Sequence, residues 1–134
     1  MSDLLPVLAV TAGDIHRATG WWVVGLVGAV GLIGIVLGIA RREPGRWFWW
    51  LVGVAAVALL SQVGLGLWRY SVDGEDPGNQ HVFYGVVVVF TLAFAYIYRG
   101  ELAKRPALSY GALLLFLMGL GVRGISTFGQ SFGS

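Results

Sequence analysis

Residues 15–40 read IHRATGWWVVGLVGAVGLIGIVLGIA, an apolar stretch in which Arg17 is the single charged side chain. Roughly 20 apolar residues in an α-helix cross the hydrocarbon core of a bilayer. Within lipid the backbone polar groups must bond to one another, so such a segment is helical. The stretch therefore predicts a transmembrane helix with a histidine, His16, near its first turn.

The rest of the chain repeats this pattern. Further apolar stretches lie at residues 47–70, 80–98 and 106–125. The whole sequence is 57% hydrophobic and 12% charged, with a mean hydropathy of +0.76. Because this composition exceeds what a soluble domain can bury, we predict an all-α integral membrane protein. Its fold is a four-helix up-down-up-down bundle, and residues 1–134 form one transmembrane domain with a polar tail at 126–134.

The N-terminal residues are apolar but too short to span. Residues 4–13 either lie in the membrane interface as an amphipathic piece or form a partly ordered tail. Residues 1–10 carry no basic region and are interrupted by Pro6, so we interpret them as part of the mature chain.

Basic residues are distributed unevenly between the two sides of the predicted bundle. The two short loops hold Arg41, Arg42, Arg46, Arg99, Lys104 and Arg105. The opposite side holds Arg17, Arg69 and Arg123, among several acidic residues. The positive-inside rule then places the short loops in the cytoplasm. The protein is accordingly predicted in the inner, or cytoplasmic, cell membrane. Both termini and both histidines are predicted on the outer side.

The two halves of the sequence resemble each other. His16 stands four residues before Gly20, and His81 stands four residues before Gly85. The second helix of each half carries a related phrase, GLGLWR at 64–69 and GLGVR at 119–123. The chain therefore looks like a duplicated helix pair with pseudo-twofold symmetry, which puts one histidine of each half at the same depth.

Two histidines at matched depth suit a haem iron. The first and third helices of such a bundle run in the same direction and sit diagonally across the core. With neighbouring helices about 8–10 Å apart, the diagonal gap is roughly 13 Å. A porphyrin fits there with His16 and His81 as axial ligands, so the residues predict a haem b site.

Glycines and arginines complete this hypothesis. Gly20 and Gly85 lie one turn deeper than the histidines on the same helix faces and would leave room for the macrocycle. The glycines at 64, 66, 119 and 121 could flank it. Arginine pairs with carboxylates through its planar fork, so Arg69 and Arg123 would bind the haem propionates.

Simpler interpretations exist for each feature. Interfacial histidines are often only solvated, and arginines near helix ends snorkel to lipid headgroups. Glycines allow close helix packing, the role expected of Gly31, Gly34 and Gly38. Gln62 could bond across helices, orient a ligand or contact a quinone, and packing is its expected role.

The sequence lacks the motifs of other kinds of functional site. The chain has no cysteine, which excludes disulfides, iron–sulfur clusters and covalent haem attachment. No spacing typical of zinc ligands, catalytic triads, phosphate loops or nucleic-acid patches is present. The absence of carboxylates within the spans argues against a proton pump.

Several short motifs resemble those of the haem A synthase family. Residues 15–17, Ile-His-Arg, are similar to the start of a histidine-bearing helix in that family, and the helix closes with arginines at 41–42. Residues 61–66, SQVGLG, resemble the glutamine phrase of its next helix, and His81 matches its second haem-ligand histidine. The resemblance covers about residues 14–98 and extends to other small membrane b-type cytochromes.

The chain departs from that family in ways that bear on function. It has one bundle rather than two, lacks a second histidine pair, and has only Asp14 where the family has a glutamate ahead of the first histidine. The resemblance thus implies haem b at His16 and His81 but not the synthase activity.

The predicted function is that of a small membrane cytochrome. Bis-histidine ligation leaves no open iron position, which favours electron transfer over catalysis. The alternative is a haem-free accessory subunit of a larger respiratory or photosynthetic complex. In either case the expected partners are the lipid bilayer and other membrane subunits, and no nucleic acid.

Overall fold

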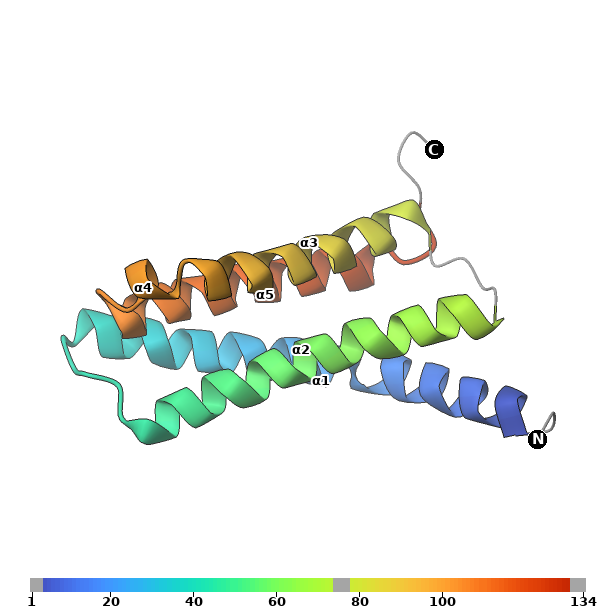
Figure 1. Ribbon diagram of the computed structural model, residues 1–134, viewed down its shortest axis with the longest axis horizontal. Coiled ribbons are helices and arrows are strands. Elements are labelled where there is room, and N and C mark those ends of the chain that lie inside the picture. Colours follow the sequence, from blue (N-terminus) through green and yellow to red (C-terminus); the bar gives the residue numbers. More distant parts are fainter. Residues whose placement is uncertain (1–3, 74–77, 131–134) are drawn as a thin grey trace.

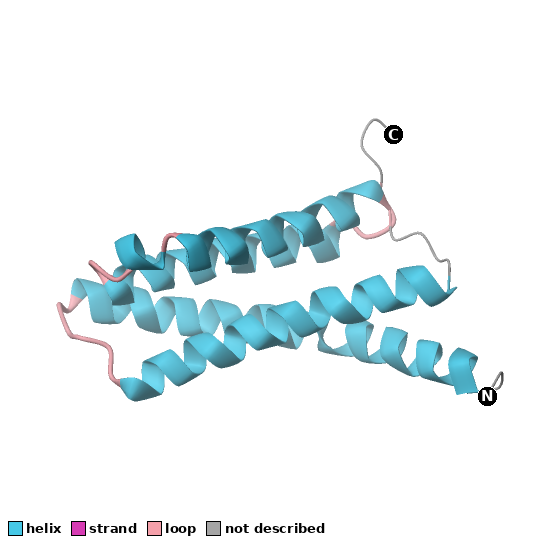
Figure 2. Cartoon of the chain, viewed as in Figure 1, coloured by secondary structure: helices cyan, strands magenta, loops and turns pink. Residues whose placement is uncertain are grey.

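The computed structural model describes residues 4–73 and 78–130, leaving aside the side chains at 5–13, 69 and 72–73. Its helices are α1 (Leu4–Ile39), α2 (Arg46–Asp73), α3 (Asn79–Ile97), α4 (Arg99–Leu102) and α5 (Pro106–Ser126). Figure 2 shows short loops between α1 and α2 and on either side of α4, and the described residues contain no strand. Four of the helices are long and apolar enough to cross a membrane, which confirms the predicted all-α four-helix bundle.

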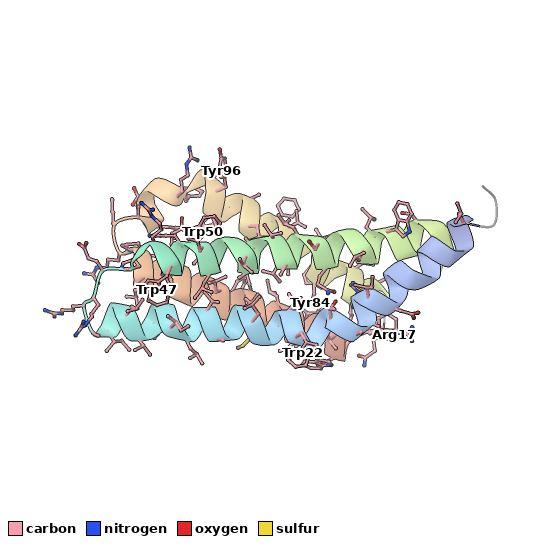
Figure 3. The ribbon with its side chains drawn as sticks, turned by 90° about the horizontal axis from the view of Figure 1, so that it is seen from below. Arg17, Trp22, Trp47, Trp50, Tyr84 and Tyr96 are labelled. Atoms are coloured by element: carbon pink, nitrogen blue, oxygen red, sulfur yellow. The ribbon has the colours of Figure 1, made fainter. Side chains whose placement is uncertain are left out.

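The four long helices run alternately up and down (Figure 1). One end of the bundle holds the α1–α2 loop and the connection through α4, and with them the basic residues of both; we call it the basic end. The start of α1 and the end of α5 lie at the other, the histidine end. Figure 3 places Trp47, Trp50 and Tyr96 toward the basic end and Trp22 toward the histidine end. This distribution is the one expected of aromatic belts at two membrane interfaces.

Local sequence explains where the helices stop. α1 ends as Arg41 turns into the left-handed region, with φ of 56°, and the Arg42 N–H bonds the Leu37 carbonyl at 2.9 Å. These are the features of a Schellman cap. Pro106 opens α5, where its missing N–H costs no hydrogen bond.

α1 is longer than the apolar stretch that predicted it. It begins at Leu4 rather than near residue 15, so the backbone of the N-terminal segment is helical and continuous with the span. Its 36 residues, at 1.5 Å each, make a helix of about 54 Å, well beyond a 30 Å hydrocarbon core. Figure 3 shows this first part of α1 bending away from the rest. The Thr19 hydroxyl bonds the Ile15 carbonyl one turn back, an interaction that often bends helices.

α1 and α5 form the closest helix pair, while α2 and α3 touch only sparsely. A Cβ added at Gly34 would lie 2.8 Å from the Ala107 carbonyl oxygen and 2.8 Å from the Gly111 Cα. One added at Gly111 would lie 2.7 Å from the Ile35 nitrogen. The predicted packing role of the α1 glycines is confirmed. We call this contact the α1–α5 seam, formed by Gly31, Gly34, Gly38, Ala107 and Gly111.

Candidate functional site

The two histidines meet at the histidine end of the bundle. His16 lies in α1, and His81 is the third residue of α3. Their ring centroids are 6.0 Å apart, and the ring planes make an angle of 86°. Both side chains are partly buried. Two residues that are 65 positions apart in the sequence, one in each half of the chain, are therefore neighbours, as the repeat predicted.

This separation can be compared with that of two imidazoles on one metal. Metal–imidazole bonds of about 2.0–2.1 Å put the centroids of two opposed rings roughly 6.3–6.5 Å apart. The observed 6.0 Å is close to that range. Each ring can rotate about its own metal–nitrogen bond, so perpendicular ring planes are compatible with shared ligation. The distance between the two ring centres is therefore compatible with two imidazoles that share one metal.

The His81 ring is held by α5. Its Nδ1 lies 2.7 Å from the Gly124 carbonyl oxygen, and its centroid is 5.3 Å from that of Phe128. Because a carbonyl only accepts, Nδ1 carries the proton and donates it. In the neutral ring Nε2 is then an acceptor with an available lone pair. A histidine ligand bound through one nitrogen commonly donates its other N–H to such a carbonyl.

The His16 ring lies against the backbone of α2. A Cβ added at Gly66 would be 3.0 Å from Cε1 and 3.4 Å from Nε2 of His16. Glycine at this position therefore lets α2 approach the ring. Gly66 belongs to the Gly-Leu-Gly phrase that the sequence placed beside the cofactor.

The other predicted site residues have varied surroundings. A Cβ at Gly20 would lie 3.6 Å from Ile125 of α5, whereas one at Gly85 would have no described atom within 4 Å beyond its own helix and its chain neighbours. Arg123 is exposed, and its Nε lies 3.4 Å from the Tyr84 hydroxyl, with the guanidinium 5.8 Å from the ring centre. The side chain of Arg69 falls outside the described residues.

Three residues at the histidine site were not predicted from the sequence. Tyr84 follows His81 by one helical turn and could have been found from that spacing. Gly124 acts through its backbone carbonyl, which has no signature in the sequence. Phe128 lies in the segment predicted as a polar tail, but this segment returns to the start of α3, where the Gln80 N–H bonds the Gln130 carbonyl at 3.2 Å.

Gln62 of α2 donates to the Thr19 hydroxyl of α1. This bond joins two helices one turn below His16, and it confirms the expected interhelical role of Gln62. Thr19 in turn donates to the Ile15 carbonyl, so the three groups form a short chain that fixes the helix carrying His16.

We expect Gln62→Leu to lower the unfolding free energy by about 0.6 kcal/mol, the average measured for hydrogen bonds between membrane helices, and by no more than about 1.7 kcal/mol, the largest value measured. A double-mutant cycle with Thr19→Val, read by unfolding in mixed micelles, would isolate the coupling between the two side chains. Ser61→Ala, at an exposed neighbouring position, serves as the control. Fully additive effects of the two substitutions would contradict a stabilising bond.

Comparison with known proteins finds no matching family model, no matching curated protein and no matching solved structure.

Proposed function

We propose that this multi-pass membrane protein binds haem b, with His16 and His81 as the two axial ligands of the iron. The observation that carries the proposal is the 6.0 Å separation of the two imidazoles, one from each half of the chain. The bond from His81 Nδ1 to the Gly124 carbonyl supports it, because that bond leaves Nε2 available to a metal.

A porphyrin explains the ligand set better than a bare metal ion does. Among the described residues, no group of three or more histidine, cysteine or acidic side chains could hold an ion. Protein sites for zinc and similar metals use at least three side-chain ligands. Haem brings four nitrogens of its own and needs only two axial ligands, which is the number of histidines in the chain.

Arg123 and Tyr84 extend the proposed site toward the membrane surface. Arg123 is exposed beside the Tyr84 hydroxyl, and its neighbour Gly124 contacts His81. A guanidinium and a phenol so close to the ligand form a suitable partner for a haem propionate. Arg69, the counterpart of Arg123 in the first half, is proposed for the second propionate.

The function that follows is electron transfer. An iron with two histidine ligands has no open position for substrate, so the protein would relay electrons between a membrane donor and an acceptor at the histidine end. The bound haem would supply the one-electron chemistry. The chain would supply the ligands, a site of low polarity and positive charge near the propionates.

The direct test is a reduced-minus-oxidised visible spectrum of protein purified in detergent after expression with ample haem. We expect a sharp b-type α-band and about one haem per chain. A folded, colourless protein would refute the proposal and favour a haem-free accessory subunit, which could then be sought by purifying the intact membrane complex.

We further propose that the basic end faces the cytoplasm and that the histidine end and both termini face outward, in accord with the positive-inside rule. The chain has no cysteine, so single substitutions can be labelled without background. In intact cells, a membrane-impermeant maleimide should label Ser126→Cys at the histidine end and leave Glu43→Cys at the basic end unlabelled until lysis. Labelling of Glu43→Cys alone would show the opposite orientation.

A further inference from the structure

α2 carries an open apolar groove near the basic end of the bundle. The groove has a volume of about 610 Å³, and all of its lining residues belong to α2. In order along the helix from the basic end, where we place the mouth of the groove, they include Arg46, Trp49, Trp50, Gly53 and Val57. A Cβ added at Gly53 would meet no described atom within 4 Å apart from its own helix and neighbours, so the glycine leaves the groove open. We call this feature the α2 groove.

The groove is one membrane leaflet long. Its residues recur every three or four positions and so lie on one stripe of the helix, while the buried Phe48, Ala55 and Leu59 face the bundle. From Arg46 to Val57 the helix rises about 17 Å at 1.5 Å per residue, roughly half of a 30 Å hydrocarbon core. One acyl chain matches the length of the groove, whose lining ends at Ala58 although the exposed face of α2 continues past it.

The mouth of the groove carries positive charge. Arg46 is exposed, and Arg41 and Arg42 are exposed in the adjoining loop, with Glu43 the one acidic residue there. Within the described ranges Arg46 has no ion-pair partner. In contrast, Lys104 at the same end pairs with Glu101 at 2.9 Å, and Arg99 donates to the Tyr96 carbonyl at 2.7 Å. The Arg46 guanidinium is thus available to an anion from outside the chain.

We propose that the α2 groove binds an anionic phospholipid, with its phosphate at Arg46 and one acyl chain along Trp49, Gly53 and Val57. Arginine binds phosphate through its planar fork, and tryptophan is favoured at the headgroup level. Basic surfaces beside membrane helices recruit anionic lipids by the same attraction. The proposal concerns a different end of the molecule from the histidines and does not depend on haem.

Native mass spectrometry of the full-length protein tests the site. Delipidated protein is titrated with phosphatidylglycerol or phosphatidylcholine of identical acyl chains, and bound lipid is counted for each variant. We expect the parent to prefer phosphatidylglycerol about fivefold, the effect of one arginine near an anionic headgroup. Arg46→Gln should abolish that preference, and Gly53→Leu should reduce binding of both lipids by filling the groove.

Two matched controls separate this site from general membrane affinity. Arg105→Gln removes an exposed charge from the same end, and Gly25→Leu fills open space on α1, so both should bind like the parent. Equal retention of the two lipids by the parent, or equal losses in Arg46→Gln and Arg105→Gln, would overturn the proposal. A parent dimer that Gly53→Leu converts to monomers would instead assign the groove to a second copy of the chain, and would also overturn it.

Discussion

Replacing His81 with alanine is expected to remove the b-type α-band from the purified protein and to lower haem occupancy more than tenfold. The substitution removes one proposed axial ligand together with the ring that bonds the Gly124 carbonyl at 2.7 Å. Losing only an outer-shell partner of a metal ligand costs about 10–100-fold in affinity or activity, and losing the ligand itself should cost at least as much. His16→Ala should give the same result, because each iron face has a single candidate ligand.

Controls for this experiment come from neighbouring positions. Val82→Ala changes an exposed residue next to His81 and should keep the parent spectrum. Gly66→Leu leaves both histidines in place but puts side-chain atoms where the His16 ring lies, 3.0 Å from the position of a Cβ. It should shift or weaken the band. Circular dichroism would establish that each variant is helical, and an unchanged band in a folded His81→Ala protein would eliminate His81 as a ligand.

The second large effect is expected at the α1–α5 seam. In Gly111→Leu, the new Cβ would lie 2.7 Å from the Ile35 nitrogen and 2.8 Å from the Gly34 carbonyl carbon, both backbone atoms. A side chain can change rotamer to relieve such a clash, but the helix backbone cannot, so the two helices must separate. We expect a loss of about 3 kcal/mol or more in unfolding free energy, at the upper end of overpacking effects.

Thermal or denaturant unfolding in detergent, followed by circular dichroism, would measure this loss. Gly25→Leu is the control, since a Cβ at this exposed α1 glycine would meet no described atom within 4 Å beyond its own helix and neighbours. It should change the unfolding free energy by less than about 0.5 kcal/mol. Similar stabilities for the two variants would mean that α1 and α5 are not closely packed.

Apolar stretches were sufficient to predict the bundle but not the full length of its first helix. Stretches at 47–70, 80–98 and 106–125 correspond closely to α2, α3 and α5, because lipid requires uninterrupted apolar helices. The segment from Leu4 to Gly13 is apolar but too short to span a membrane by itself, so span length did not reveal that its helix continues into the first span. Pro6 also suggested a break, but it lies in the first turn, where helix N–H groups have no partner.

The histidine pair was predictable and its surroundings were not. His16 and His81 occupy matched places in a repeat, which brings them together in any bundle that keeps the repeat. Their contacts depend on how closely the two halves obey the pseudo-twofold symmetry, which relates the α1–α5 pair to the α2–α3 pair. The symmetry holds only in part, because α1 and α5 pack closely whereas α2 and α3 barely touch. The Gly124 carbonyl reaches His81 through the placement of α5, which no motif records.

The α1–α5 seam can form only after α5 has been synthesised, which bears on when the histidine site is completed. The ribosome releases α1 and α2 first, and they form a hairpin with one histidine. The carbonyl that orients the other histidine belongs to α5, and so does the glycine face that packs against α1; α5 is made after α1, α2 and α3. A chain made only as far as α3 therefore carries both histidines but lacks the carbonyl that orients His81, so the proposed site is complete only when α5 is in place.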